Sequence, residues 1–421
     1  MKPNFCLPWR ALFIAALWSL AATAQAALSL AEAERLALEA DPVIEATEAR
    51  AEALREDAVA DGQLPDPKMR IGLFNLPLDS FDISQEPTTQ LRFGYLQAIP
   101  RGDTLEYRQR RTEWLAQAQS ARARAERRRV QREVREKYLE VYFQVRAAEI
   151  IRASRTLFEQ LVEVTRYQFA AGRVTQQDVL RAQVELSRLD DRETRIRNRE
   201  EVERANLATW IGEAAWQPLP TALPRLPALP GRDAIAATLD RHPLLAFKAA
   251  QVESWQQGVQ IAREQYKPGW NLGIEYRKRF GENPNGTDRA DMMAAMVTFD
   301  LPLFADQRQD KRLNASLRKA AAARLDKADM HRNLLAMLDR EYANWNRLGE
   351  RQRLYAERLV GEAQSNAEAA LKAYQSGLTE FTTLMRARLT ELDVRLDELR
   401  IWTDRARAQA RLLYLLTEEE Q

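Results

Sequence analysis

The sequence has few of the residues from which common active sites are built. Its 421 residues include only two histidines, one cysteine and fifteen glycines. These counts leave little material for histidine metal sites, disulfides or glycine-rich phosphate loops. We also find no nucleophile beside a base and no cluster of metal-ligating residues. We therefore predict that the chain is not an enzyme, has no cofactor and holds no metal ion in a dedicated site.

Net charge is also nearly absent. Lysine and arginine together number 63 and aspartate and glutamate 61, which gives a formal charge of +2. A neutral chain has no global field with which to attract nucleic acid, so we predict no nucleic-acid partner. With 45% hydrophobic and 29% charged residues, the composition excludes both a helical membrane protein and a disordered chain.

Residues 1–26 are predicted to be a secretory signal peptide. A basic start with Lys2 and Arg10 is followed by an apolar run and by the small-x-small sequence Ala24-Gln25-Ala26. The apolar run is too short to remain as a membrane-spanning helix. Cys6 precedes it, so a chain cut after Ala26 contains no cysteine. Its stability must then come from size, packing or oligomerisation.

Beyond the signal peptide the sequence repeats itself once. Asp41-Pro42 is echoed by His242-Pro243 at an offset of 201 residues, and Gly172 by Gly377 at an offset of 205. An offset of 204 relates four apolar positions of the first copy to four of the second: Val130, Val134, Tyr138 and Val141 to Leu334, Leu338, Tyr342 and Trp345. Collinear matches with a slowly drifting offset predict a duplicated unit. The predicted parts are a first copy at residues 27–216, a proline-rich linker at 217–232 and a second copy at 233–421.

Each copy is predicted to contain a helix, two short strands and two long helices. Ser29 and Glu32 form a predicted capping box at the start of the first helix. Alternation of apolar and polar residues is clearest from Trp270 to Tyr276, where every second residue is apolar. The strands are expected at residues 69–76, 89–99, 270–276 and 291–301.

A proline-free stretch of roughly seventy residues follows each strand pair and would form a helix of about 100 Å. Its apolar positions Val130, Val134, Tyr138, Val141, Val145 and Ala148 have the spacing of a coiled-coil seam. Such a long helix is stable only if it packs on neighbours. A second long helix is therefore expected to return alongside it in each copy.

Two structures are compatible with four such strands. The sheet could pack on its own helices in a soluble α+β core, or its apolar face could meet lipid. The helices are much longer than a short sheet can cover and already use their apolar seam on each other, which favours lipid. Since about eight strands are needed for a closed barrel, sister chains must then supply the missing strands. A soluble periplasmic coiled-coil scaffold remains the alternative from another functional class.

The segment from Ala171 to Ala182, AGRVTQQDVLRA, resembles the turn and returning helix of a hairpin in the outer membrane factors, the TolC-like efflux channels of Gram-negative bacteria. Ser376 to Phe381 is a second copy of this turn, and Thr298 to Phe304 resembles the family's exit from strand to helix. The resemblance covers essentially the whole mature chain. It implies a mainly α fold with a small β part, in which a homotrimer forms a twelve-stranded outer-membrane β-barrel and a periplasmic helical tunnel.

The resemblance also implies partners and a location. Such channels lie in the outer membrane, extend into the periplasm and bind a periplasmic adaptor that is coupled to an inner-membrane pump, here expected to be of the RND type. Leu64-Pro65-Asp66-Pro67, Asn75-Leu76-Pro77 and Gln85-Glu86-Pro87 look most like members encoded with heavy-metal pumps. We therefore expect a channel for heavy-metal cations, with drug export or type I protein secretion as alternatives.

Two groups of residues are implied to be functional. The adaptor-docking hairpin tips are Gly172, Arg173, Val174, Thr175 and Gln176, with Gly377, Leu378, Thr379, Glu380 and Phe381 in the second copy. For both glycines a helix C-cap is expected as well. For Phe381 two alternatives stay open, exposure at the tip and burial against its own helix.

The periplasmic constriction is expected to involve Asp178, Thr383 and Arg386. Asp178 matches a position where the family carries an acid, and a symmetric ring of carboxylates would favour cations. A solvated aspartate near a helix start is the competing interpretation. Thr383 and Arg386 stand where acids are common in the family, so Arg386 could pair with an acid such as Asp178.

The methionines and histidines of the sequence are not predicted to be metal ligands. Met292, Met293 and Met296 contain soft sulfur, but strand alternation places Met293 on the opposite face from the other two, so packing is favoured. His242 is expected at a helix start and His331 on a solvated helix.

Overall fold

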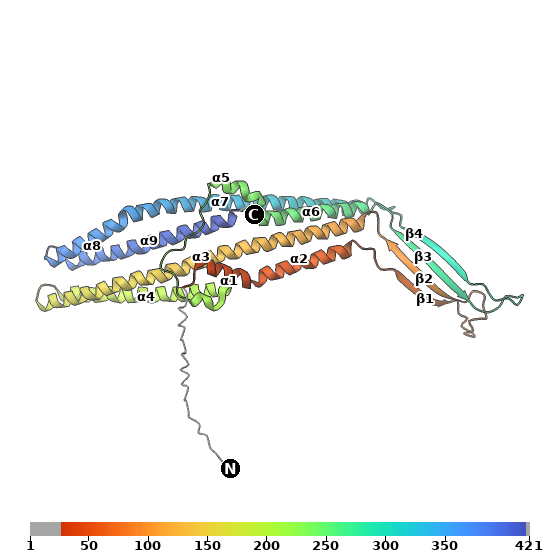
Figure 1. Ribbon diagram of the computed structural model, residues 1–421, viewed down its shortest axis with the longest axis horizontal. Coiled ribbons are helices and arrows are strands. Elements are labelled where there is room, and N and C mark those ends of the chain that lie inside the picture. Colours follow the sequence, from red (N-terminus) through yellow and green to blue (C-terminus); the bar gives the residue numbers. More distant parts are fainter. Residues whose placement is uncertain (1–26, 418–421) are drawn as a thin grey trace, which may run out of the picture.

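The computed structural model describes residues 27–417, so the predicted signal peptide lies outside the described residues. This part of the chain is elongated, with a β-sheet at one end and the turns of two helical hairpins at the other (Figure 1). Long helices run between the two ends. None of the helices within residues 27–417 combines the length and the apolar character that a membrane crossing requires.

The first half contains two consecutive helices, two strands and a long helical hairpin. In chain order the elements are α1 (Leu30–Ala40), α2 (Pro42–Asp61), β1 (Lys68–Phe74), β2 (Gln90–Ile99), α3 (Thr104–Ala170), α4 (Gln176–Ile211) and the 3₁₀ helix η1 (Gly212–Trp216). Residues 217–231, without helix or strand, connect this half to the next.

The second half follows the same plan. Its elements are α5 (Arg232–Thr238), the 3₁₀ helix η2 (Leu239–Arg241), α6 (Pro243–Glu264), β3 (Trp270–Arg279), β4 (Met292–Phe299), α7 (Gln309–Leu354), the π-helical turn η3 (Tyr355–Leu359), α8 (Val360–Gln375) and α9 (Phe381–Leu415).

The prediction of a single opening helix in the first half is wrong. The chain breaks at Asp41, whose carboxylate accepts a hydrogen bond of 2.8 Å from the Val43 amide, and Pro42 occupies the first position of α2. Proline fits there because its missing N–H needs no partner in a first turn. At the start of α1, the Ser29 hydroxyl accepts from the Glu32 amide at 3.1 Å, while the Glu32 carboxylate pairs with an arginine. Only one half of the predicted capping box is therefore formed.

The four strands form one antiparallel sheet in the order β1-β2-β3-β4, close to the predicted positions. The central pair joins the two halves of the chain, because Gln90 to Ile99 lie opposite Arg279 to Trp270. The two copies thus share a single sheet.

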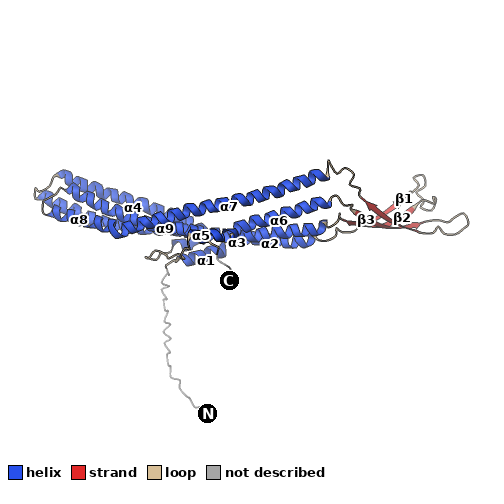
Figure 2. Ribbon diagram, turned by 90° about the horizontal axis from the view of Figure 1, so that it is seen from above, coloured by secondary structure: helices blue, strands red, loops and turns tan. Residues whose placement is uncertain are grey.

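The helices beside the sheet continue the order of the strands. α2 packs on α3, α3 on α6 and α6 on α7, and each of the four adjoins one strand along the chain. Figure 2 shows this layer leading from the sheet toward the hairpins, with α7 along one side. The result is a four-stranded sheet that continues into a four-helix layer, with α2 and α7 at its two margins.

The predicted seam of α3 is buried, with five of its six residues at most 3% exposed and Val145 at the margin of the core. Besides packing on the returning helix, this side of α3 makes two hydrogen bonds to other segments. The Tyr138 hydroxyl donates to the Leu28 carbonyl at 2.7 Å, and the Tyr142 hydroxyl donates to the Thr221 carbonyl at 2.8 Å. α3 therefore also anchors the segment before α1 and the linker between the halves.

The π turn η3 explains the last step in the drift of the repeat offset. The offset between the copies is 204 at Tyr138 and Tyr342 but 205 at Gly172 and Gly377. η3 lies between these matches in the second copy, and a π turn accommodates one extra residue within an α-helix. The corresponding part of the first copy is the uninterrupted helix α3.

His242 has the predicted position at a helix start. It caps α6, where its Nδ1 accepts from the Leu244 amide at 3.3 Å and its Nε2 lies 3.2 Å from the Tyr414 carbonyl oxygen. The ring is fully buried, and burial lowers its pKa to about 4. His331 lies on α7, 3.5 Å from Asp240.

Candidate functional site

One face of the sheet is apolar and uncovered. The strand register places Phe93 beside Tyr276 and Trp270 beside Phe299, with ring centroids 6.3 Å and 5.2 Å apart. The same face carries Met69, Ile71, Leu73, Tyr95, Leu272, Ile274, Met293 and Val297. The exposed fractions of these twelve side chains run from 38% for Phe93 to 76% for Met293, so nothing within residues 27–417 covers this face. The alternative of a sheet packed on its own helices is therefore wrong.

The sheet is also open at both edges. Within the described part of the chain, no strand pairs with the outer edge of β1 or of β4. Each edge exposes backbone N–H and C=O groups that require partners. An apolar face between two open edges is the main feature of this end of the molecule.

The first hairpin tip joins α3 to α4. Gly172 has a φ of 68°, and the Arg173 amide donates to the Gln168 carbonyl at 2.9 Å, which together form a Schellman C-cap. Thr175 then caps α4 in a capping box with Asp178. The predicted C-cap at this glycine is present, and the turn residues lie at the far end of the hairpin from the sheet (Figure 1).

The second tip joins α8 to α9 and has the same backbone geometry. Gly377 has a φ of 73°, and the Leu378 amide donates to the Ala373 carbonyl at 2.8 Å. Glu380 occupies the N-cap position of α9, but its side chain makes no capping hydrogen bond. The two tips thus share a fold while only the first has a capping box.

Leu378 and Phe381 have opposite environments at the second tip. Leu378 is 82% exposed, whereas Phe381 is 2% exposed and lies edge-on to Tyr374, with ring centroids 5.6 Å apart. The alternative of an exposed Phe381 is therefore wrong, because its ring fills the core shared by the two hairpins. Leu378 is the apolar side chain that this tip presents.

The two hairpins contact each other just above their tips. The Tyr374 hydroxyl of the second hairpin donates to Gln168 Oε1 of the first at 2.6 Å. Burial raises the Tyr374 pKa, and the negative charge of Asp178 raises it further. Asp178 thus lies close to the contact between the hairpins.

Within residues 27–417, no hydrogen bond or ion pair links the three predicted constriction residues to one another. The Asp178 carboxylate accepts from the Thr175 amide at 3.1 Å and from its hydroxyl at 2.8 Å, which agrees with the helix-start interpretation. Thr383 and Arg386 are exposed on α9, and Arg386 makes no ion pair within residues 27–417. Any pairing of Arg386 with Asp178 would therefore have to involve another copy of the chain.

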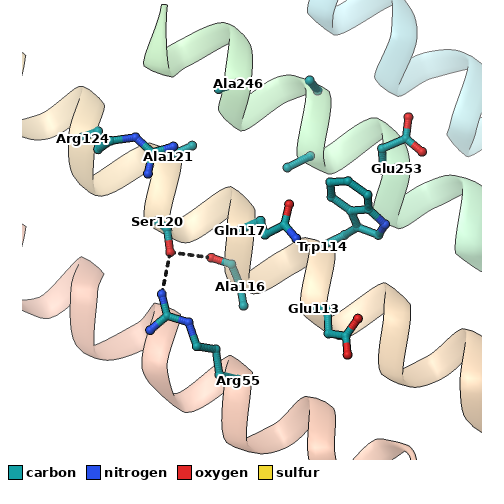
Figure 3. A pocket seen from close by; sticks show the side chains of 12 residues that line it. Arg55, Glu113, Trp114, Ala116, Gln117, Ser120, Ala121, Arg124, Ala246 and Glu253 are labelled. Atoms are coloured by element: carbon teal, nitrogen blue, oxygen red, sulfur yellow. Dashed lines mark hydrogen bonds between the residues drawn. The ribbon is translucent and has the colours of Figure 1, made fainter. Parts of the chain in front are cut away.

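A surface groove with a volume of about 570 Å³ lies between α2, α3 and α6. Figure 3 shows its alanine-rich wall, where Arg55 donates to the Ser120 hydroxyl at 3.1 Å and Ser120 donates to the Ala116 carbonyl at 3.1 Å. Its lining residues contain no nucleophile–base pair. Over residues 27–417, no three histidine, aspartate or glutamate side chains are grouped so as to hold a metal ion.

The sequence of the second half has a family match. Residues 234–418 match the outer membrane efflux protein family. The description of this family concerns efflux and not a class of enzyme, in agreement with the prediction that the chain is not an enzyme. No curated protein sequence matches the chain.

Solved outer-membrane channels share the fold over nearly the whole chain. VceC from Vibrio cholerae superposes with a TM-score of 0.78 and 16% identity, covering 92% of this chain and 95% of VceC. CusC gives 0.77 and 13%, with 93% of each chain covered. The open state of MtrE from Neisseria gonorrhoeae gives 0.77 and 14%, covering 92% of this chain and 88% of MtrE. At these identities the likeness establishes a common fold, which includes the first half that the family model does not match.

Sequence reasoning missed two features of these sites. The contact between Tyr374 and Gln168 joins residues 206 positions apart and has no local signal. The sequence predicted a charged face only for the strand that begins at Trp270. The total charge of the second face of the sheet depends on the register between the strands, which the sequence does not give. That register now places Arg92 opposite Arg277.

Proposed function

We propose that this chain is an outer membrane efflux protein, that it is the exit duct of a tripartite efflux system and that it acts as a homotrimer in the outer membrane. The single observation that carries the proposal is the exposed apolar face of the sheet between two open edges. In water such a face would be a large apolar patch of a kind that monomeric proteins rarely expose. In lipid the face is stable, but the edges are not, because hydrocarbon offers no hydrogen-bond partners.

Copies of the same chain can close the edges. The β4 edge of one copy would pair with the β1 edge of the next, and α7 would lie beside α2 in the same order. Two copies would supply eight strands, which enclose only their own side chains, so a water-filled duct needs at least three. Twelve strands also agree with the resemblance to TolC-like channels.

The hairpin tips would then point into the periplasm, away from the membrane end. We assign adaptor docking to the turn residues 172–176 and 377–381, with Leu378 as the apolar contact and Phe381 as the buried residue that holds the tip in shape. The adaptor would connect the duct to an inner-membrane pump. Transport energy would come from that pump, since the duct itself only provides a path.

The closed end of the duct would lie near the same tips. Asp178, Thr383 and Arg386 are proposed to line it, with Arg386 of one copy facing Asp178 of the next. Opening would be a shift between two packings of the hairpins when an adaptor binds. Replacing Asp178 by alanine should then increase the conductance of the closed channel.

The proposal is tested by extracting the full chain from membranes and measuring its assembly and conductance. We expect detergent to be required, a particle of three protein copies, and ion-conducting steps in a planar bilayer. Each precursor chain weighs 48.4 kDa, so monomer and trimer are easily separated by light scattering. A monomer released by salt washing would contradict the proposal and support the soluble scaffold.

The exported substrate is a separate question. Export of heavy-metal cations stays a prediction that rests on short loop motifs. Growth of a gene deletion strain on copper, silver, zinc, cobalt and cadmium tests it directly. Unchanged metal tolerance would favour drug or protein export.

A further inference from the structure

The second face of the sheet is basic. Opposite the apolar side chains, the strand register aligns Lys68 and Arg70 of β1, Arg92 of β2, and Arg277 and Arg279 of β3 on one face. The same face has one carboxylate, Glu275, and the remaining positions are uncharged. The five cations and one anion give this face a net charge of +4 per chain, although the whole sequence is nearly neutral.

Two of the five cations share the carboxylate. The Arg277 Nε donates to Glu275 Oε1 at 2.6 Å, and the Arg92 Nε lies 3.8 Å from the same oxygen. The Arg92 guanidinium also stacks over the Phe74 ring, 4.0 Å from its centroid. Glu275 therefore holds two arginines side by side without neutralising both.

The other three cations have no such partner. The side chains of Lys68, Arg70 and Arg279 make no ion pair within residues 27–417. Lys68 and Arg70 are exposed, on the strand at the edge of the sheet. Their charge is thus available to solutes that pass along this face.

We propose that the membrane section of the duct selects for anions and that its exported substrates are anionic solutes, in contrast to the heavy-metal cations predicted from the loop motifs. This inference rests on the proposed function, because lipid on the apolar face places the basic face in the lumen. Three copies would surround the lumen with twelve net positive charges, three times the charge of one face. Rings of fixed charge in a water-filled pore concentrate ions of the opposite sign and repel ions of the same sign.

Apart from Glu275, the acidic residues near the sheet lie beyond the strands and not on this face. The loop between β1 and β2 contains Asp79, Asp82 and Glu86, and the loop between β3 and β4 contains Glu282, Asp288 and Asp291. Except for Asp291, whose carboxylate accepts from the Tyr276 hydroxyl on the apolar face, these residues are expected to line the outer mouth. Selectivity for anions is therefore assigned to the part of the lumen that the strands surround. Substitutions on the strands test this assignment without changing the charge of the loops.

The experiment measures reversal potentials of the full trimer in a planar bilayer under a KCl gradient from about 0.01 to 0.1 M, where the Debye length is about 30 to 10 Å. The wild-type channel should pass chloride at least about threefold better than potassium. Replacing both Lys68→Gln and Arg70→Gln should at least halve this ratio, because half of the net charge is removed. The control exchanges the two residues, Lys68→Arg with Arg70→Lys, and should leave the ratio unchanged.

A variant of opposite sign gives a second arm. Glu275→Gln removes the only carboxylate of the face, so the preference for chloride should increase. Liposomes that contain the trimer should also release an anionic fluorophore faster than a cationic one of the same size. Both effects should shrink at about 1 M salt, where the Debye length is about 3 Å.

The outcomes separate the two proposals. A purified protein that forms no trimer and no conducting pore contradicts the proposed function. A conducting trimer that prefers potassium, or whose selectivity is the same after loss of Lys68 and Arg70, overturns the anion inference and leaves the duct intact. A preference for potassium would in addition support export of metal cations.

Discussion

Phe381→Ala should loosen the second hairpin tip without changing its exposed surface. The Phe381 ring is almost fully buried between the hairpins and contacts Tyr374 edge-on. Truncating a buried phenylalanine to alanine costs about 3 to 5 kcal/mol, from lost burial and from the cavity that remains. We expect the whole cost to fall on the contact between the two hairpins.

Hydrogen exchange measures this cost locally. A loss of about 3 to 5 kcal/mol corresponds to faster exchange by about two to four powers of ten in the amides that open together. These should include amides near Tyr374 and Leu384, whose side chains belong to the same core. Amides of the strands should keep their protection.

Leu378→Ala is the matched control, because the same tip holds this residue at 82% exposure. It should change stability by less than about 0.5 kcal/mol and exchange by no more than about twofold. The roles reverse in adaptor binding, which Leu378→Ala should weaken directly. Equal exchange rates in both variants would refute the argument that Phe381 stabilises the tip from inside, while Leu378 is an exposed contact residue.

Three further substitutions, at His242, Gly361 and Gly377, have predictable effects on stability. The buried His242 has a pKa of about 4 against an ordinary value of 6.5, so the unfolded chain binds a proton that the folded chain excludes. Stability should therefore fall by up to about 3 kcal/mol as pH drops from 6.5 to 4, and urea unfolding of His242→Asn should show a smaller fall. An equal fall in both proteins would contradict this. Gly361→Ala should stabilise α8 by about 1 kcal/mol, since a Cβ there meets no atom within 4 Å. Gly377→Ala should destabilise the tip by about 1 to 2 kcal/mol because its φ is 73°. Hydrogen exchange checks both signs.

The general plan of the fold could be predicted from local patterns. Alternation between Trp270 and Tyr276 located β3, and the seam from Val130 to Ala148 located the buried side of α3. Both patterns reflect which side of an element is apolar, and that property does not depend on the rest of the chain. The break at Asp41 was missed although Asp-Pro is a helix-start signal, because the apolar pattern continues across it.

Features that depend on distant residues could not be predicted. Burial of Phe381 depends on Tyr374 and on the first hairpin, so the sequence left two alternatives open. The π turn at Tyr355–Leu359 was present in the sequence only as a change of one residue in the repeat offset. The offset gives the number of extra residues, whereas the position of the π turn between α7 and α8 requires the backbone of the whole helix.

The central claim is that the apolar face of the sheet meets lipid and the basic face meets water. Cys6 is the only cysteine of the sequence and lies in the predicted signal peptide. Single cysteines can therefore be introduced and spin-labelled along residues 270–277 of the membrane-inserted trimer without a competing thiol. Collisions with oxygen and with a water-soluble nickel complex then report the surroundings of each label. The account predicts alternation, with oxygen favoured at 270, 272, 274 and 276 and the nickel complex at the residues between them. Equal access of the nickel complex to both sets would contradict it.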